Sequence, residues 1–134
     1  MIGSSLRRHS SEKAASAQLL LVVDDDPDIL DLMSEALMSR GYRVATAING
    51  EDALERIAEQ APQLILLDMR MPVMDGWEFA RVLRERYGRA IPVVVVTAAE
   101  DSKLRAAEVG AEGYLGKPFE LEELYDIVAD ILTG

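Results

Sequence analysis

Four short apolar runs in this chain each end in polar residues whose side chains could take part in metal or phosphate chemistry. The polar residues are Asp24, Asp25, Asp26, Asp68, Thr97 and Lys117, and the runs before them cover residues 19–23, 64–67, 93–96 and 114–116. In an open parallel sheet, the carboxyl ends of the strands form the ligand crevice. If the four runs lie in one such sheet, carboxylates, a hydroxyl and an ammonium group meet at one edge. This set would suit a metal ion and a phosphoryl group.

The aspartate triplet 24–26 has two interpretations. One aspartate before a helix is an ordinary cap, because its carboxylate accepts hydrogen bonds from free N–H groups of the first turn. Three adjacent carboxylates repel, by about 4 kcal/mol per pair at about 4 Å and an effective dielectric constant of about 20. A cation would offset that repulsion. The triplet alone therefore leaves capping and metal binding open.

Asp68 ends a run that we expect to be a buried strand, where an unpaired carboxylate is costly. A nearby lysine would satisfy it, and a metal site shared with Asp25 is the alternative if the two strands are neighbours. An all-oxygen site favours a hard cation that keeps several waters, Mg²⁺ above all. The single histidine, His9, lies in the N-terminal segment, which argues against zinc.

Thr97 and Lys117 are weak signals when each is taken alone, because a threonine often ends a strand and a lysine before proline is usually solvated. At one sheet edge with carboxylates they gain meaning. The hydroxyl can donate to an oxyanion, and the ammonium can pair with an aspartate or with phosphate oxygens. Such a set could stabilise phosphoryl transfer to an aspartate, which is a known carboxylate nucleophile.

The elements that must position these residues alternate between apolar strand-like runs and helical patterns. The first helix is the clearest, with Asp26 as its cap, Pro27 at its first position and Gly41 just past its end. Asn49 and Gly50 predict a turn. The expected strands cover 19–23, 42–47, 64–67, 93–96 and 114–116, and the helices cover 27–40, 51–60, the region around 77–83, 102–109 and 121–131. Five strands alternating with five helices indicate an α/β fold with a parallel sheet that is buried on both faces.

Length and composition predict one globular domain. The chain has 134 residues, of which 49% are hydrophobic and 28% charged, and it has no cysteine. Residues 1–17 are rich in Ser, Ala, Gly and Arg, and we expect a disordered leader there, followed by one domain over 18–134. The net charge of the whole chain is −10, and the leader contributes +2, so residues 18–134 carry a net charge of −12.

An acidic body repels nucleic-acid phosphates and anionic lipids, so we expect neither direct nucleic-acid binding nor membrane binding. No apolar run approaches the ~20 residues that span a bilayer, and we expect a cytoplasmic protein.

Four segments together resemble the receiver domain of two-component response regulators, in particular the stand-alone, chemotaxis-regulator-like type. They cover residues 22–26, 67–76, 96–98 and 116–119, in the order and spacing of that family, and the likeness extends over 18 to 133. It implies a flavodoxin-like (βα)5 three-layer sandwich whose five-stranded parallel sheet has the order 2-1-3-4-5. That order comes from the family and not from this sequence.

The resemblance also implies the reaction. Asp68 would be the phosphoacceptor, taking a phosphoryl group from a histidine kinase or a histidine phosphotransfer protein. Asp25 would bind Mg²⁺ directly and Asp24 largely through water. Asp68 and the backbone carbonyl of Arg70 would be further ligands, and Mn²⁺ is an alternative ion. The protein would be a switch that assists its own phosphorylation and dephosphorylation, and not a dedicated enzyme.

The remaining implied roles concern the response to phosphorylation. Lys117 would bind a phosphoryl oxygen and form a cis peptide bond with Pro118. Thr97 would move toward the phosphoryl group, and Tyr114 would turn inward in response. The surface that signals to a downstream protein, or that pairs two copies in a phosphorylation-dependent dimer, would comprise residues 102–109, 114–116 and 121–131.

Two variable positions bear on the lifetime of the phosphoryl group. In the family, the residues two after the acceptor and two after the switch threonine modulate dephosphorylation, and here they are Arg70 and Ala99. Arg70 could lean over the phosphoryl group while the small Ala99 leaves water a path. Trp77 and the methionines of the 69–75 loop are interpreted as packing residues.

There are four alternatives to a stand-alone receiver. A receiver excised from a larger regulator or hybrid kinase would carry the same site as a stand-alone receiver. A Mg²⁺-dependent aspartyl phosphohydrolase typically has a second aspartate two residues after the nucleophile, and that position is Arg70 here. A pseudo-receiver would not need the intact acidic set, and a nucleotide-binding domain would need a glycine-rich phosphate loop after a strand.

Overall fold

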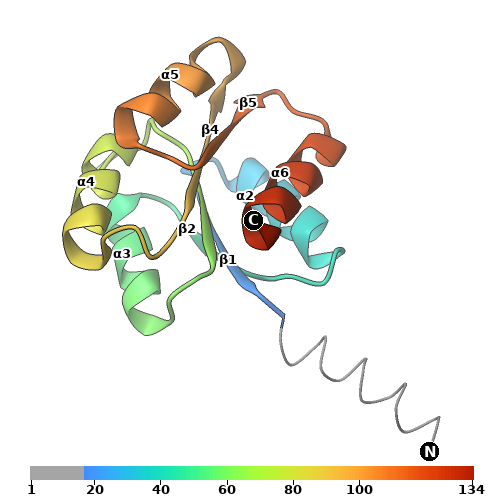
Figure 1. Ribbon diagram of the computed structural model, residues 1–134, viewed down its shortest axis with the longest axis horizontal. Coiled ribbons are helices and arrows are strands. Elements are labelled where there is room, and N and C mark those ends of the chain that lie inside the picture. The colour runs from blue at the N-terminus through green and yellow to red at the C-terminus, as the bar shows by residue number, and fades with distance from the viewer. Residues whose placement is uncertain (1–16) are drawn as a thin grey trace, which may run out of the picture.

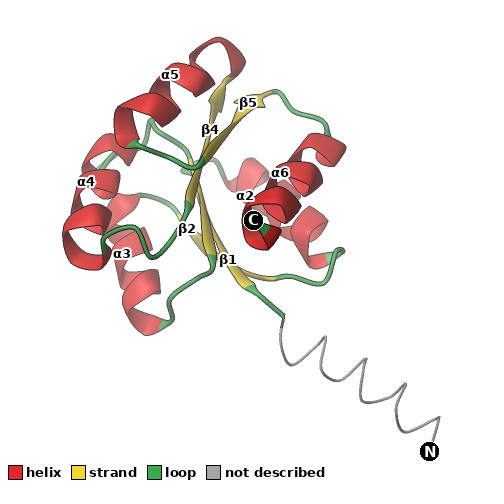
Figure 2. Ribbon diagram, in the orientation of Figure 1, coloured by secondary structure: helices red, strands yellow, loops and turns green. Residues whose placement is uncertain are grey.

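Helices cover both faces of a five-stranded parallel sheet in residues 17–134, the part of the chain that this computed structural model describes (Figure 1; Figure 2). The strands are β1 (Leu19–Val23), β2 (Arg43–Ala47), β3 (Leu64–Leu67), β4 (Val93–Ala98) and β5 (Gly113–Lys117). The helices are α2 (Pro27–Met38), α3 (Gly50–Glu59), α4 (Gly76–Tyr87), α5 (Ala99–Val109) and α6 (Leu121–Thr133). The strand order is β2-β1-β3-β4-β5, which confirms the flavodoxin-like order 2-1-3-4-5. The expected leader over 1–17 lies, apart from Ala17, outside the described residues.

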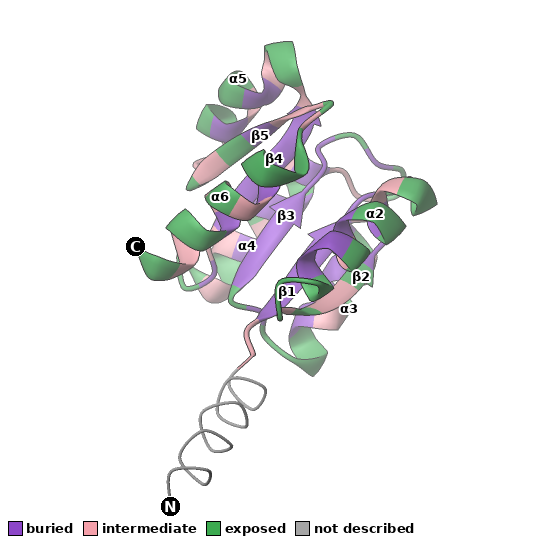
Figure 3. Ribbon diagram, turned by 90° about the vertical axis from the view of Figure 1, so that its right-hand side faces the viewer, coloured by how far each residue is buried: buried purple, intermediate pink, exposed green. Residues whose placement is uncertain are grey.

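Two hydrophobic cores hold the three layers together. Alternate residues of β1 face opposite sides of the sheet, so Leu21 and Val23 pack in one core and Leu20 and Val22 in the other. The first core contains apolar residues of α3, α4 and α5, among them the fully buried Phe79, and the second contains those of α2 and α6. Figure 3 shows the central strands β1, β3 and β4 buried between helices whose outer faces are exposed. The edge strands β2 and β5 are only partly buried, because each has a neighbouring strand on one side only, so the expected burial on both faces holds for the central strands alone. Burial on both faces explains why β1 and β3 are continuous apolar runs.

Helix α3 begins where the sequence predicted a turn. The side chain of Asn49 accepts a hydrogen bond from the backbone N–H of Asp52 at 2.8 Å and so caps the helix, with Gly50 as its first residue. The carboxylate of Asp52 accepts in return from the backbone N–H of Ile48 at 3.1 Å. Asparagine favours both turns and helix caps, so the dipeptide alone did not separate the two.

Helix α5 begins at Ala99, three residues before the predicted start at Ser102. The residue before the helix, Ala98, has no side chain that could cap it, so the sequence carries no start signal there. Ser102 lies inside the first turn and donates from its hydroxyl to the carbonyl of Ala99 at 3.2 Å. Among the described residues, no helix is long and apolar enough to cross a membrane.

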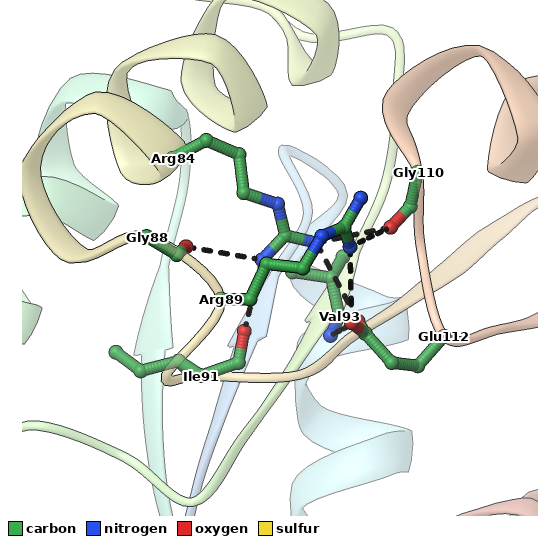
Figure 4. Close-up of polar contacts among 7 residues, drawn as sticks. All are labelled: Arg84, Gly88, Arg89, Ile91, Val93, Gly110 and Glu112. Atoms are coloured by element: carbon green, nitrogen blue, oxygen red, sulfur yellow. Dashed lines mark hydrogen bonds and ion pairs between the residues drawn. The ribbon is translucent and has the colours of Figure 1, made fainter.

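The side chain of Glu112, just before β5, contacts the start of β4 and two arginines at and after the end of α4 (Figure 4). Its carboxylate accepts from the backbone N–H of Val93, at the start of β4, at 2.8 Å. It also pairs with Arg84 of α4 at 3.5 Å and with Arg89 at 3.3 Å. Both arginines donate to the carbonyl of Gly110, at 3.1 Å and 2.8 Å, at the end of α5. The network therefore joins the ends of α4 and α5 to the start of β4.

We expect Glu112→Ala to lower the free energy of unfolding by about 1–3 kcal/mol, because it leaves a half-buried backbone N–H without its acceptor. Glu112→Gln keeps a carbonyl oxygen for Val93 and should lose clearly less. Urea unfolding measures both, with the exposed Glu55→Ala as the control that should stay within about 0.5 kcal/mol of wild type. Equal losses for Glu112→Ala and Glu55→Ala would contradict this role.

Candidate functional site

The acidic residues meet because β1 and β3 are neighbours that end at the same edge. The backbone N–H of Asp68 donates to the carbonyl of Val23 at 2.9 Å, and that of Asp24 donates to Ala47 at 3.0 Å. Both aspartates thus continue the pairing of the sheet one residue past their strands. Carboxylate oxygens of Asp24, Asp25 and Asp68 all lie within 4.8 Å of one another. The sequence prediction that these side chains share one edge agrees with this arrangement.

Lys117 reaches this acidic group from the end of β5. Its Nζ lies 2.8 Å from Oδ2 of Asp24 and 3.7 Å from Oδ1 of Asp68. The pairing of β4 with β5 sets Thr97 beside Gly116 and Ala98 beside Lys117. The ammonium group therefore lies between the two carboxylates, as a counter-charge to both.

Burial and like charge control the titration of the site. Asp24 is 2% exposed and Asp68 7% exposed. Burial, and then the negative charge of Asp24, raise the pKa of Asp68 from 3.8 to about 6, against the opposing effect of Lys117. Burial opposes the charge of Lys117, but its hydrogen bond to Asp24 and the charge of Asp68 raise its pKa. The site thus holds a carboxylate that is costly to ionise beside a firmly charged lysine.

Within the aspartate triplet, helix capping and possible metal binding fall to different residues. Asp26 caps α2, because its carboxylate accepts from the backbone N–H of Asp28 at 2.9 Å. Asp24 accepts from the backbone N–H of Asp26 at 2.9 Å with one oxygen and from Lys117 with the other. Asp25 is exposed and directs a carboxylate oxygen toward the group. Capping therefore accounts for one of the three residues only.

The donor set fits a hard divalent cation. Three carboxylates converge and one ammonium group faces them, so ionisation of all three leaves an excess of negative charge. Oxygen ligands with this spacing are those that Mg²⁺ binds, together with water. Asp24, Asp25 and Asp68 are the residues that could hold it. The backbone carbonyl of Arg70, in the loop after Asp68, stays a prediction as a further ligand.

The residues expected to move are found in two different environments. Thr97 is buried at 8% exposure in β4, where it pairs with Gly116, whereas Tyr114 on β5 is 44% exposed. The peptide bond between Lys117 and Pro118 is cis, as the resemblance implied. The inward turn of Tyr114 and the movement of Thr97 stay predictions.

Gly76 and Gly116 allow close backbone approaches near the site, a role that was not predicted from the sequence. A Cβ on Gly76 would lie 2.8 Å from Cα of Met69, and one on Gly116 would lie 2.6 Å from Cα of Ala99. These close approaches let α4 begin directly against the loop after Asp68, and they pack β5 against the start of α5. Both glycines lie inside the segments that resemble the receiver family, and this resemblance was the only sequence signal that could have pointed to their role.

Comparison with known proteins agrees with this geometry. Residues 20–129 match the family model described as the response regulator receiver domain. The chain is 41% identical over 115 residues to the transcriptional regulatory protein PrrA of Mycobacterium tuberculosis, covering 84% of this chain and 49% of PrrA. The chain therefore spans about half the length of the curated relatives it matches.

Solved structures show the same fold. The chemotaxis protein CheY4 of Vibrio cholerae has a TM-score of 0.79 at 33% identity, over 87% of this chain and 100% of that one. The receiver domain of sensor histidine kinase PA1611 from Pseudomonas aeruginosa has a TM-score of 0.81 at 32% identity, over 89% and 100%. That structure is described with a magnesium ion coordinated in its active site cleft. With the acidic group, Lys117 and the strand order in place, this chain belongs to the receiver domains of two-component response regulators.

Proposed function

We propose that Asp68 accepts a phosphoryl group from a histidine kinase or histidine phosphotransfer protein, in a Mg²⁺-dependent reaction in the cytoplasm. The observation that carries the proposal is the arrangement of Asp24, Asp25 and Asp68 within 4.8 Å, with Lys117 paired to two of them. A buried, partly compensated carboxylate next to two possible metal ligands is suited to receive a phosphoryl group and to hold its charge.

The transfer forms one bond and breaks one. An ionised carboxylate oxygen of Asp68 attacks phosphorus, the bond between phosphorus and the donor imidazole breaks, and the donor histidine leaves. The product is an acyl phosphate on Asp68. Lys117, held by Asp24 at 2.8 Å, is near enough to pair with a phosphoryl oxygen. Asp24, Asp25 and Asp68 would hold Mg²⁺, which would supply positive charge to stabilise the transferring phosphoryl oxygens.

The response to phosphorylation runs through β4 and β5 in this proposal. The hydroxyl of Thr97 turns toward a phosphoryl oxygen, and Tyr114 moves inward into the space that is released. The output surface consists of α5, β5 and α6. This surface carries the exposed apolar side chains Leu104, Tyr114 and Leu121, which a downstream protein or a second copy could cover.

The receiver switch comprises residues 18–134, preceded by the leader over 1–17. The same switch serves in a stand-alone receiver and in a module of a longer regulator or hybrid kinase. We expect no direct contact with nucleic acid or membrane, because residues 18–134 carry a net charge of −12. The switch also assists its own dephosphorylation, and Mn²⁺ can substitute for Mg²⁺.

The metal dependence can be tested with a small phosphodonor. We expect acetyl phosphate to phosphorylate the protein in the presence of Mg²⁺ and not in EDTA. In Asp25→Asn, the Mg²⁺ concentration for half-maximal phosphorylation should rise by roughly tenfold or more, because a charged ligand is lost. Asp31→Asn, the same chemical change on an exposed residue of α2, should leave this concentration unchanged. Phosphorylation at full rate in EDTA, or equal Mg²⁺ requirements in Asp25→Asn and wild type, would contradict the proposed metal site.

A further inference from the structure

Two arginines lie over the ring of Trp77, the only tryptophan in the chain. The guanidinium carbon of Arg70 is 5.8 Å from the ring centroid and that of Arg105 is 5.4 Å from it. Both distances are within the range of a cation–π contact. The indole Nε1 donates to Oε1 of Glu108 at 2.9 Å, which fixes the orientation of the ring. We call these four residues the Trp77 cluster.

The Trp77 cluster joins the acceptor loop to a helix of the output surface. Arg70 follows the phosphoacceptor Asp68 by two residues, and Trp77 lies in the first turn of α4. Arg105 and Glu108 belong to α5. The cluster thus connects the neighbourhood of Asp68 with α5 by a route separate from Thr97 and Tyr114.

The two arginines of the cluster are held very differently. Arg105 donates to both carboxylate oxygens of Glu108, at 3.0 Å and 3.1 Å, and its side chain is 19% exposed. Arg70 is exposed, and its side chain contacts the ring of Trp77. Within residues 17–134, the side chain of Arg70 forms no hydrogen bond and no ion pair. An exposed cation–π contact is weaker than a charge-assisted hydrogen bond to a phosphoryl oxygen. A phosphoryl group on Asp68 would therefore compete successfully with the ring for Arg70.

We infer that Trp77 is a positioning residue that holds Arg70 on its ring in the unphosphorylated protein and competes for Arg70 after phosphorylation. This inference rests on the proposed function of Asp68. When Arg70 leaves the ring, its guanidinium pairs with a phosphoryl oxygen and shields the phosphorus from attacking water. The ring of Trp77 and the phosphoryl group then compete for Arg70, and this competition contributes to the rate at which the phosphoryl group is hydrolysed.

The decay of the phosphorylated protein tests this inference. The protein is loaded with acetyl phosphate and Mg²⁺, the donor is removed, and the remaining phosphoryl group is followed by intact mass. Arg70→Ala should decay about two- to fivefold faster than wild type, because the shield is lost. Trp77→Leu should decay more slowly, because Arg70 is no longer drawn to the ring. Arg81→Ala removes an arginine of α4 that pairs with Glu78 and Glu85, and should decay at the wild-type rate.

A double variant separates positioning from a merely structural role. In the Arg70→Ala background, Trp77→Leu should have no further effect on the decay rate. The emission of Trp77 should change on phosphorylation in wild type and change far less in phosphorylated Arg70→Ala. An equal effect of Trp77→Leu in both backgrounds, or an undiminished emission change in Arg70→Ala, would overturn this inference and leave the proposed function of Asp68 intact. A wild-type protein that gains no phosphoryl group would overturn the proposed function, and this inference with it.

Discussion

Replacing Lys117 by methionine is expected to lower the free energy of unfolding of the metal-free protein by about 3 kcal/mol. The change removes the partner of Asp24, which is 2% exposed and 2.8 Å from Nζ, and also the counter-charge of Asp68 at 3.7 Å. Breaking a buried ion pair on one side typically costs about 3–5 kcal/mol, because the other charge is left unpaired. The lower end applies here because the Lys117 side chain retains 27% exposure.

Urea unfolding at pH 7.5 in EDTA measures this loss. Lys103→Met, on an exposed position of α5, is the matched control and should stay within about 0.5 kcal/mol of wild type. Addition of Mg²⁺ should recover part of the loss in Lys117→Met, because a cation held by the carboxylates replaces the missing positive charge. The same loss in Lys117→Met and Lys103→Met would contradict a structural role for the Lys117–Asp24 pair.

Asp68→Asn is expected to have the opposite sign and to raise the free energy of unfolding of the metal-free protein by about 2 kcal/mol at pH 7.5. The pKa of Asp68 is 3.8 when exposed and about 6 in the folded protein. Since the folded state holds this proton more tightly, ionisation of Asp68 costs stability as the pH rises from about 4 to about 6. The full shift, which already includes the attraction to Lys117, sets an upper limit of about 3 kcal/mol, and partial exposure to solvent lowers it. The neutral amide avoids this cost.

The advantage of Asp68→Asn should therefore depend on pH. It should be small near pH 4, where the carboxyl is protonated in the folded protein, and complete above pH 7. Unfolding in metal-free buffers from pH 4 to 8 measures this, with Asp31→Asn as the exposed control that shows no such trend. Added Mg²⁺ should narrow the difference, because wild type retains Asp68 as a ligand. A variant less stable than wild type in EDTA at pH 7.5 would contradict the account of burial and repulsion at Asp68.

The sheet and the edge where the site lies could be predicted from the sequence because both depend on strong local signals. Continuous apolar runs mark strands buried on both faces, and the polar residue that ends each run then has only one edge to occupy. The start of α5 could not be predicted, because Ala98 has no capping side chain. The start of α3 was interpreted as a turn, because Asn49 is suited to either structure.

The division of labour within the site depended on geometry that a sequence does not carry. The triplet 24–26 allowed both capping and metal binding until the backbone assigned the cap to Asp26. Trp77 was interpreted as a packing residue, and it does pack against the first core while partly buried. Its contact with Glu108 arises because α4 packs against α5, and its contact with Arg70 arises because the loop after Asp68 leads into α4. No local sequence pattern could have predicted either contact.

The most direct test of the central claim is the intact mass of the protein after incubation with acetyl phosphate and Mg²⁺, followed by fragmentation to locate the modified residue. The account predicts that wild type and the exposed control Asp31→Asn each gain one phosphoryl group, carried on Asp68, and that Asp68→Asn gains none. A phosphoryl group on Asp68→Asn at the wild-type level, or an unmodified wild-type protein in the presence of Mg²⁺, would contradict it.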